Sequence, residues 1–114
     1  MARTLDFNSI NRPTLSLVMR DENKTRIKVT TPSESLVREL QDMLPELEPR
    51  LRAGNAEAID ECYNLAAKLI NHNLSFVTVT AAELREKYML ELDYLVMFFA
   101  AYVEFIGEIT NAKN

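Results

Sequence analysis

Cys62 and His72 are the side chains best suited to nucleophilic, acid–base or metal chemistry, and the chain has one residue of each type. A thiolate nucleophile needs an adjacent base, and a zinc site of the usual kind needs several cysteine or histidine ligands. Cys62 falls within an apolar helical stripe, which indicates a buried, inert thiol. His72 falls in the last turn of the same predicted helix, where a cation is tolerated. The sequence therefore predicts no metal site and no intrachain disulfide.

The other signatures of catalysis are also absent. The chain contains no GxSxG or HExxH motif, and its two glycines are too few for a phosphate-binding loop. The acidic pairs Glu46/Glu48 and Asp60/Glu61 are not spaced to share one helical face, so we interpret them as solvated surface. We predict that the protein is not an enzyme and uses no cofactor or small-molecule substrate.

Charge and hydropathy restrict the partners further. The chain has 114 residues, with 13 Lys and Arg against 17 Asp and Glu, a net charge of -4 that does not suit nucleic-acid binding. Its longest apolar run, Tyr94–Val103, is shorter than the ~20 residues of a membrane span and is flanked by acids. The first residues lack the apolar segment of a signal peptide. We expect one cytoplasmic domain over residues 1–114 that binds neither nucleic acid nor membrane.

Over residues 14 to about 31, apolar and polar side chains alternate on either side of the loop DENK. This period of two predicts an antiparallel β-hairpin with one buried face. The earlier segment TLDFNSI is a candidate third strand. The outer face of the hairpin is basic and carries Arg20, Lys24, Arg26 and Lys28. These charges either guard an exposed strand edge or dock an acidic partner segment.

Three helices are predicted after the hairpin, over residues of about 32–52, 56–72 and 81–106. An N-terminal hairpin followed by helices places the chain in the α+β class.

Capping residues set the expected ends of these helices. Thr31 and Thr80 each precede a glutamate by three residues, which is the capping-box spacing, and Asn55 is a candidate N-cap after a glycine. Pro45 and Pro49 each lack an amide donor and crowd the preceding turn. We therefore expect the first helix to break near Pro45.

The last predicted helix is apolar nearly all the way around and contains YLVMFFAAYVEFIGEI. One broad stripe is assigned to the domain's own core and comprises Leu84, Tyr88, Leu92, Leu95, Val96, Phe99, Val103 and Ile106. The opposite face is the predicted partner-binding site and comprises Leu90, Tyr94, Met97, Phe98, Ala101 and Phe105. Either this face binds a partner helix or a second copy of the chain, or the helix lies centrally and is covered on both faces.

The length of this helix is a second reason to expect exposed apolar surface. A helix over residues 81–106 is about 39 Å long. A domain of this size is roughly 35 Å across. The helix is therefore expected to bend or to project beyond the domain with its C-terminal half.

The order of the elements and two segments resemble a known family. TTPSESLVRELQDML follows the basic hairpin, and FFAAYVEFIGEITNAKN ends the chain. In these features the chain resembles the tail assembly chaperones of long-tailed (siphovirus-like) phages and prophages of Gram-positive bacteria. The resemblance covers the organisation of the whole chain and includes no catalytic motif.

The resemblance implies a non-enzymatic protein of the bacterial host cytoplasm. Such chaperones bind the tape measure protein, a long helical client, and keep it soluble while tail tube subunits polymerise around it. A longer product often arises by ribosomal frameshifting. The family has no fixed binding residues to carry over, so the predicted site depends on helix geometry alone. The alternative is a structural virion component, either a small head–tail connector or a tail-completion subunit, that forms a homo-oligomeric ring through the same helix.

Overall fold

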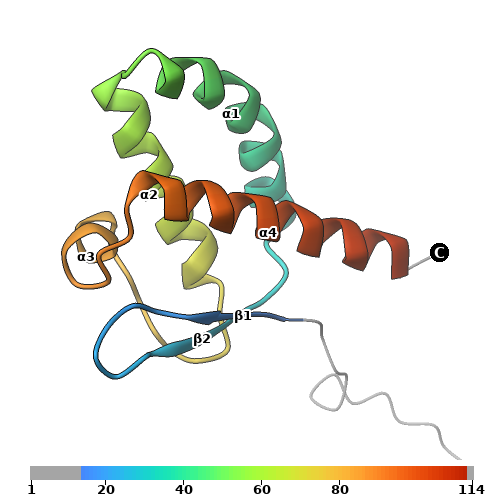
Figure 1. Cartoon of the computed structure of the whole chain (residues 1–114). Coiled ribbons are helices and arrows are strands. Elements are labelled where there is room, and N and C mark those ends of the chain that lie inside the picture. The colour runs from blue at the N-terminus through green and yellow to red at the C-terminus, as the bar shows by residue number, and fades with distance from the viewer. Residues whose placement is uncertain (1–13, 113–114) are drawn as a thin grey trace, which may run out of the picture.

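The structure, a computed structural model, describes residues 14–112 of the chain. Within them a two-stranded antiparallel hairpin is followed by four helices, which confirms the predicted α+β class (Figure 1). The elements are β1 (Leu15–Val18), β2 (Arg26–Val29), α1 (Glu34–Arg52), α2 (Ala56–Asn71), α3 (Ala81–Glu86) and α4 (Leu92–Ala112). The candidate third strand TLDFNSI lies outside the described residues.

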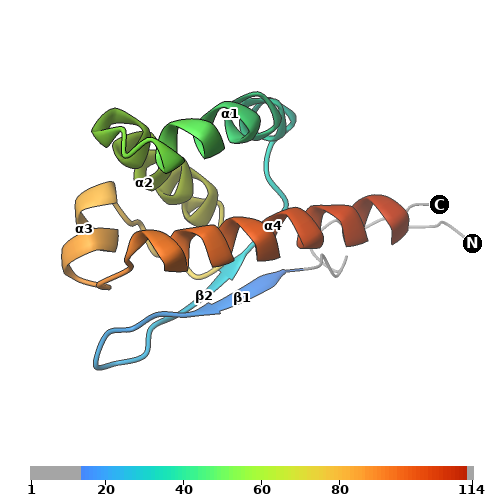
Figure 2. The same cartoon turned by 45° about the horizontal axis from the view of Figure 1, so that its top comes forward.

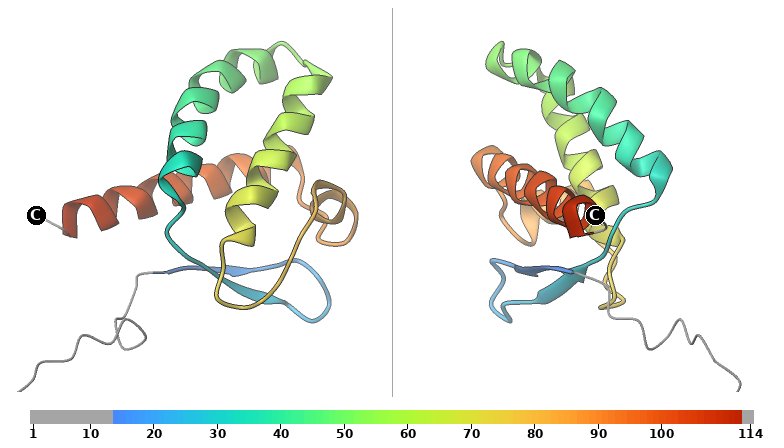
Figure 3. Two further views of the ribbon diagram at one scale, coloured as in Figure 1. Left: turned by 180° about the vertical axis from the view of Figure 1, so that it is seen from behind. Right: turned by 90° about the vertical axis from the view of Figure 1, so that its right-hand side faces the viewer.

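Helix α2 is the central element of the fold, because it packs against α1, α3, α4 and β2. Figure 2 shows α1 and α2 on one side of α4 and the hairpin on the other. Seen from behind, α2 crosses α4 (Figure 3). The side chains that α2 buries follow the helical period and include Cys62, Leu65, Leu69 and Ile70. The core therefore lies around α2, and the hairpin closes its lower end.

The hairpin has the alternation that the sequence predicts. Ile27 and Val29 of β2 are fully buried, whereas Arg26 and Lys28, which alternate with them, are exposed on the outer face. The free edge of β2 is covered by the segment that follows α2, where the Leu74 amide donates to the Lys28 carbonyl at 2.9 Å. This hydrogen bond places the loop after α2 directly beside the sheet.

Helix α1 runs without a break from Glu34 to Arg52, so the break predicted near Pro45 is wrong. Both prolines lie inside the helix and are exposed, so water reaches the carbonyls that lose their amide partners. In Figure 1 the helix curves along this length. Its N-cap is Ser33, whose hydroxyl accepts from the Leu36 amide at 3.3 Å, rather than the predicted Thr31.

The continuous helix predicted over residues 81–106 is also wrong. Helix α3 ends at Glu86, and α4 starts at Leu92 after a turn in which Met89 has a left-handed φ of 51°. Two long-range hydrogen bonds hold this turn. The Tyr63 hydroxyl donates to the Leu90 carbonyl at 2.6 Å, and the Arg20 guanidinium donates to the Met89 carbonyl at 2.8 Å. The chain bends here without a glycine because partners distant in sequence hold the bend. Figures 1 and 2 also show the C-terminal end of α4 projecting beyond the other elements, as expected.

Candidate partner-binding site

The buried face of α4 differs from the face that the sequence pattern assigns to the core. Leu95, Phe99, Tyr102 and Phe105 are buried at helical spacing. The rings of Tyr102 and Phe105 have centroids 6.1 Å apart, and the ring of Phe98 contacts those of both Phe99 and Tyr102. Tyr102 belongs to neither of the two faces assigned from sequence. Phe105, assigned to the partner-binding face, is only 6% exposed, so that assignment is wrong.

Two residues assigned to the core are instead half-exposed. Val96 is 54% exposed and Val103 is 49% exposed. The two residues lie on the same side of α4, two helical turns apart. The helix is rotated about its axis relative to the expectation because the large aromatic rings take the interior. The β-branched valines are left on the surface as a result.

The six residues of the predicted partner-binding site do not form one surface. Met97 is 66% exposed. The ring of Tyr94 is partly buried beneath the Arg20 guanidinium, at 4.4 Å from the ring centroid. Leu90, Phe98 and Ala101 are partly buried, the first two packed against the core. Of the predicted set, Met97 alone presents most of its side chain to solvent.

The Tyr102 hydroxyl is buried and has no hydrogen-bond partner among the described residues. Burial raises the pKa of this phenol well above its ordinary value. A buried hydroxyl without a partner loses its hydration without compensation. We therefore expect Tyr102→Phe to raise the free energy of unfolding by about 1 kcal/mol, as measured by urea denaturation.

Tyr63→Phe is the matched control for this substitution. Tyr63 is also buried, but its hydroxyl donates to the Leu90 carbonyl. Removing it should lower the free energy of unfolding by about 1 kcal/mol. A loss of stability in Tyr102→Phe comparable to that of Tyr63→Phe would contradict an unpaired Tyr102 hydroxyl.

A groove of about 630 Å³ lies between α1 and α4, and we call it the α1–α4 groove. Its walls are two apolar rows at helical spacing, which comprise Leu44, Leu47 and Leu51 of α1 and Val96, Phe99 and Val103 of α4. Cys62 of α2 also contributes to the lining. The half-exposed valines of α4 therefore face apolar side chains of α1 across an open space. Sequence reasoning missed this site because the α1 half of it comes from a segment far away in the chain.

The polar groups of the groove lie at its rim and neutralise each other. Glu48 and Arg52 form an exposed ion pair at 2.6 Å, one helical turn apart. Burial raises the pKa of the Cys62 thiol, and the nearby Glu61 carboxylate raises it further, which opposes thiolate formation. Cys62 is buried, as the sequence pattern predicts. Within the groove the described side chains offer apolar contact rather than acid–base chemistry.

Other sites that could carry chemistry are not supported by the described residues. His72 is exposed and caps α2, and its carbonyl accepts from the Thr30 amide at 2.7 Å. Across residues 14–112 no cluster of three or more His, Cys, Asp or Glu side chains could hold a metal ion. No described helix has the length and apolarity needed to span a membrane.

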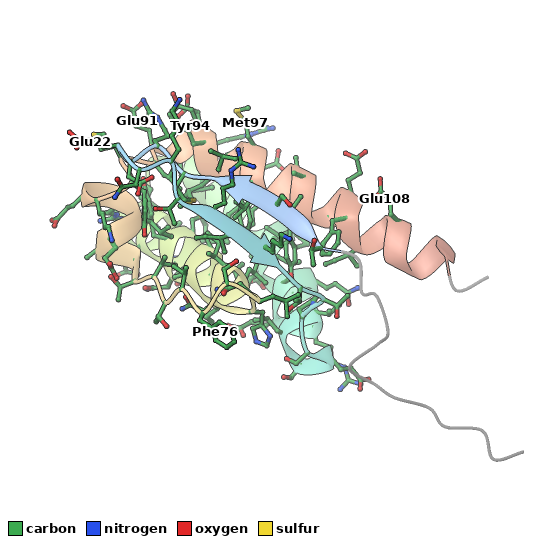
Figure 4. The ribbon with its side chains drawn as sticks, turned by 90° about the horizontal axis from the view of Figure 1, so that it is seen from below. Glu22, Phe76, Glu91, Tyr94, Met97 and Glu108 are labelled. Carbon is green, nitrogen blue, oxygen red and sulfur yellow. The ribbon has the colours of Figure 1, made fainter. Side chains whose placement is uncertain are left out.

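The loop between α2 and α3 presents an aromatic side chain that the sequence analysis did not single out. Phe76 is 98% exposed and has a left-handed φ of 57°. The Asn73 side chain holds the loop by donating to the Ile70 and Val77 carbonyls and accepting from the Ser75 and Val77 amides. In Figure 4, Phe76 projects from one edge of the molecule, and Tyr94 and Met97 lie at the opposite edge. No periodic pattern marks such a residue, since its exposure follows from the loop conformation.

Comparison of the chain with protein-family models, with curated proteins and with solved structures gives no match.

Proposed function

We propose that the protein is a non-enzymatic phage tail assembly chaperone that binds a helical client, the tape measure protein, in the α1–α4 groove. The observation that carries this proposal is the pair of apolar rows that face each other across the groove. Amphipathic helices bind in this manner, with side chains at positions i, i+3, i+4 and i+7 inserted into an apolar groove. The family resemblance is the reason for naming the tape measure protein as the client. The groove is the surface to which we propose that it binds.

The composition of the groove favours a helix over a small molecule. Sites for small ligands combine apolar walls with a few convergent polar groups that fix the orientation of the ligand. Here the polar groups at the groove, Glu48 and Arg52, are already paired with each other at the rim. A surface without such orienting groups suits a partner recognised by shape and apolar area. The same feature supports a binding role without catalysis.

A glutamate at position 103 tests the groove directly. Val103→Glu places a carboxylate on the groove wall, where a bound apolar helix would bury it without a partner. We expect the soluble fraction of a co-produced candidate tape measure protein, measured after centrifugation, to fall severalfold. Folding should be preserved because Val103 is half-exposed. Circular dichroism checks this point.

Met97→Glu is the matched control, because Met97 is exposed on α4 and does not line the groove. This variant should keep the client as soluble as the unmodified protein does. If Met97→Glu lowers the soluble fraction of the client and Val103→Glu does not, the client binds another side of α4 and the groove assignment is wrong. If neither variant changes client solubility, α4 is not the binding element.

Gene order is an independent test of the same proposal. A tail tube gene upstream and a very long gene for a helical protein downstream would support it. A ribosomal or metabolic neighbourhood would contradict it.

A further inference from the structure

Phe76 is held in a position in which its whole side chain faces solvent. Its backbone has a left-handed φ, a conformation that L residues other than glycine adopt rarely. The Asn73 side chain makes four hydrogen bonds, one to the end of α2 and three within the loop. The Asn71 side chain makes two more, donating to the Val79 carbonyl and accepting from the Val79 amide. These hydrogen bonds fix the conformation of the loop, so the exposed ring has a defined position.

An aromatic ring on a preorganised loop suits insertion into an apolar recess. Little conformational freedom remains to be lost when such a loop binds, and aromatic anchors dominate the energetics of many interfaces. The α1–α4 groove is an apolar recess of about 630 Å³ on the same chain. It is lined by α1, α4 and Cys62 in the first half of α2, whereas Phe76 lies in the loop beyond the C-terminal end of α2, beside the hairpin and at the edge of the molecule opposite Tyr94 and Met97 (Figure 4). One copy therefore cannot fill its own groove with its own Phe76, but a second copy can.

The charges around the two sites are complementary. Arg26 and Lys28 are exposed on the strand beside the Phe76 loop, and neither forms an ion pair within residues 14–112. Between its first and last residues α4 has three acids, Asp93, Glu104 and Glu108, and no Lys or Arg. Glu104 and Glu108 are exposed, and Glu108 lies about one turn from the C-terminal end of α4, where the helix dipole disfavours negative charge. A basic surface from another molecule would offset that cost.

We infer that copies of the chain associate head to tail, with Phe76 of one copy inserted into the α1–α4 groove of the next. The basic outer face of the hairpin then lies against the acidic exposed side of α4. Because the two contacting surfaces are different, an open assembly retains one unused Phe76 loop at one end and one unused groove at the other. Such a heterologous interface forms a ring if the rotation closes and a filament if it does not.

This inference shares the groove with the proposed function but does not depend on the client. Where both hold, a client helix and a neighbouring Phe76 compete for one groove, so self-association covers the apolar surface until a client binds. The variant Phe76→Ser separates the two ideas, since it removes the inserted ring and leaves its own groove intact. It should therefore still keep a client soluble.

The test is the association state of full-length variants, measured by sedimentation velocity over a series of concentrations. The unmodified protein is expected to form dimers and larger species. Phe76→Ser and Val103→Glu should each raise the dissociation constant at least tenfold. Asn64→Ala, which changes an exposed residue of α2 outside both the groove and the acidic side of α4, should leave the dissociation constant unchanged. Circular dichroism establishes that each variant is folded.

Mixing the two defective variants gives the decisive result. Phe76→Ser retains a groove, and Val103→Glu retains Phe76, so an equimolar mixture should form a 1:1 heterodimer that grows no further. An interface built from the same patch on both copies would show no such complementation. The inference is overturned if the unmodified protein is monomeric at its highest soluble concentration, if Phe76→Ser associates as strongly as the unmodified protein, or if the mixture stays monomeric.

A charge exchange tests the same interface without touching Phe76 or the groove. Lys28→Glu and Glu104→Lys each place like charges across the proposed contact and should each weaken self-association severalfold. A mixture of the two variants brings the introduced carboxylate of one copy against the introduced ammonium of the other in one orientation, and should restore association. Unchanged association in both single variants would contradict the proposed arrangement of the hairpin against α4.

Discussion

Leu95→Ala is expected to lower the free energy of unfolding by about 2–5 kcal/mol. Leu95 is fully buried in the first turn of α4, which packs against α2. Truncation to alanine removes apolar surface from the core and leaves a cavity that a helix–helix contact cannot easily close. Urea denaturation followed by circular dichroism measures the change. The dependence on urea should keep its slope, which shows that the same surface is exposed on unfolding.

Val96→Ala is the control, because Val96 is the next residue on the same helix and is half-exposed in the groove. It should change the free energy of unfolding by no more than about 0.5 kcal/mol, in line with other surface substitutions. The sequence pattern assigns both residues to the buried stripe, whereas the structure buries Leu95 and exposes Val96. Comparing the two variants therefore tests which of the two descriptions holds. Equal losses in the two variants would show that α4 is rotated toward the predicted face.

Asn73→Ala is expected to lower the free energy of unfolding by about 2–4 kcal/mol, because it removes four hydrogen bonds at about 1 kcal/mol each. The Asn73 carboxamide bonds the end of α2 to the loop, and its backbone forms a bridge with Val29 of the hairpin. The substitution also frees the Phe76 loop, so it should weaken self-association as well as stability. Thermal unfolding and sedimentation velocity measure the two effects.

Asn64→Ala is the control for this substitution. Asn64 is exposed in the middle of α2 and makes no side-chain hydrogen bond with the described residues. Alanine favours the helix there, so stability should stay the same or rise by a few tenths of a kcal/mol. Asn73→Asp keeps the two acceptor bonds and loses the two donor bonds, so its stability should be intermediate. A change below about 0.5 kcal/mol in Asn73→Ala would contradict the structural role of this side chain.

The capping residues show how far local chemistry predicts the fold. The Thr80 hydroxyl accepts from the Glu83 amide and the Glu83 carboxylate accepts from the Thr80 amide, which confirms the predicted capping box. Asn55 accepts from the Ala58 amide at the start of α2, also as predicted. These interactions span three residues, so the sequence contains both partners side by side.

The candidate site shows where local patterns fail. Residues 81–106, predicted as one helix, contain no glycine or proline, yet the chain turns at Met89. The Tyr63 hydroxyl and the Arg20 guanidinium hold that turn from 27 and 69 residues away. The face of α4 that enters the core is similarly chosen by contacts with α2, and not by the periodicity of a helix that is apolar on every side.

The sequence alone therefore determined the α+β class, the alternation of the hairpin, the approximate helical segments and two of the helix caps. Each of these follows from interactions between residues that are close in the chain. Only the tertiary structure decided the bend before α4, the rotation that exposes Val96 and Val103, the groove they form with α1 and the exposure of Phe76. The reason is that an amphipathic pattern specifies a buried face only when the opposite face is polar. Where both faces are apolar, packing against distant segments selects between them.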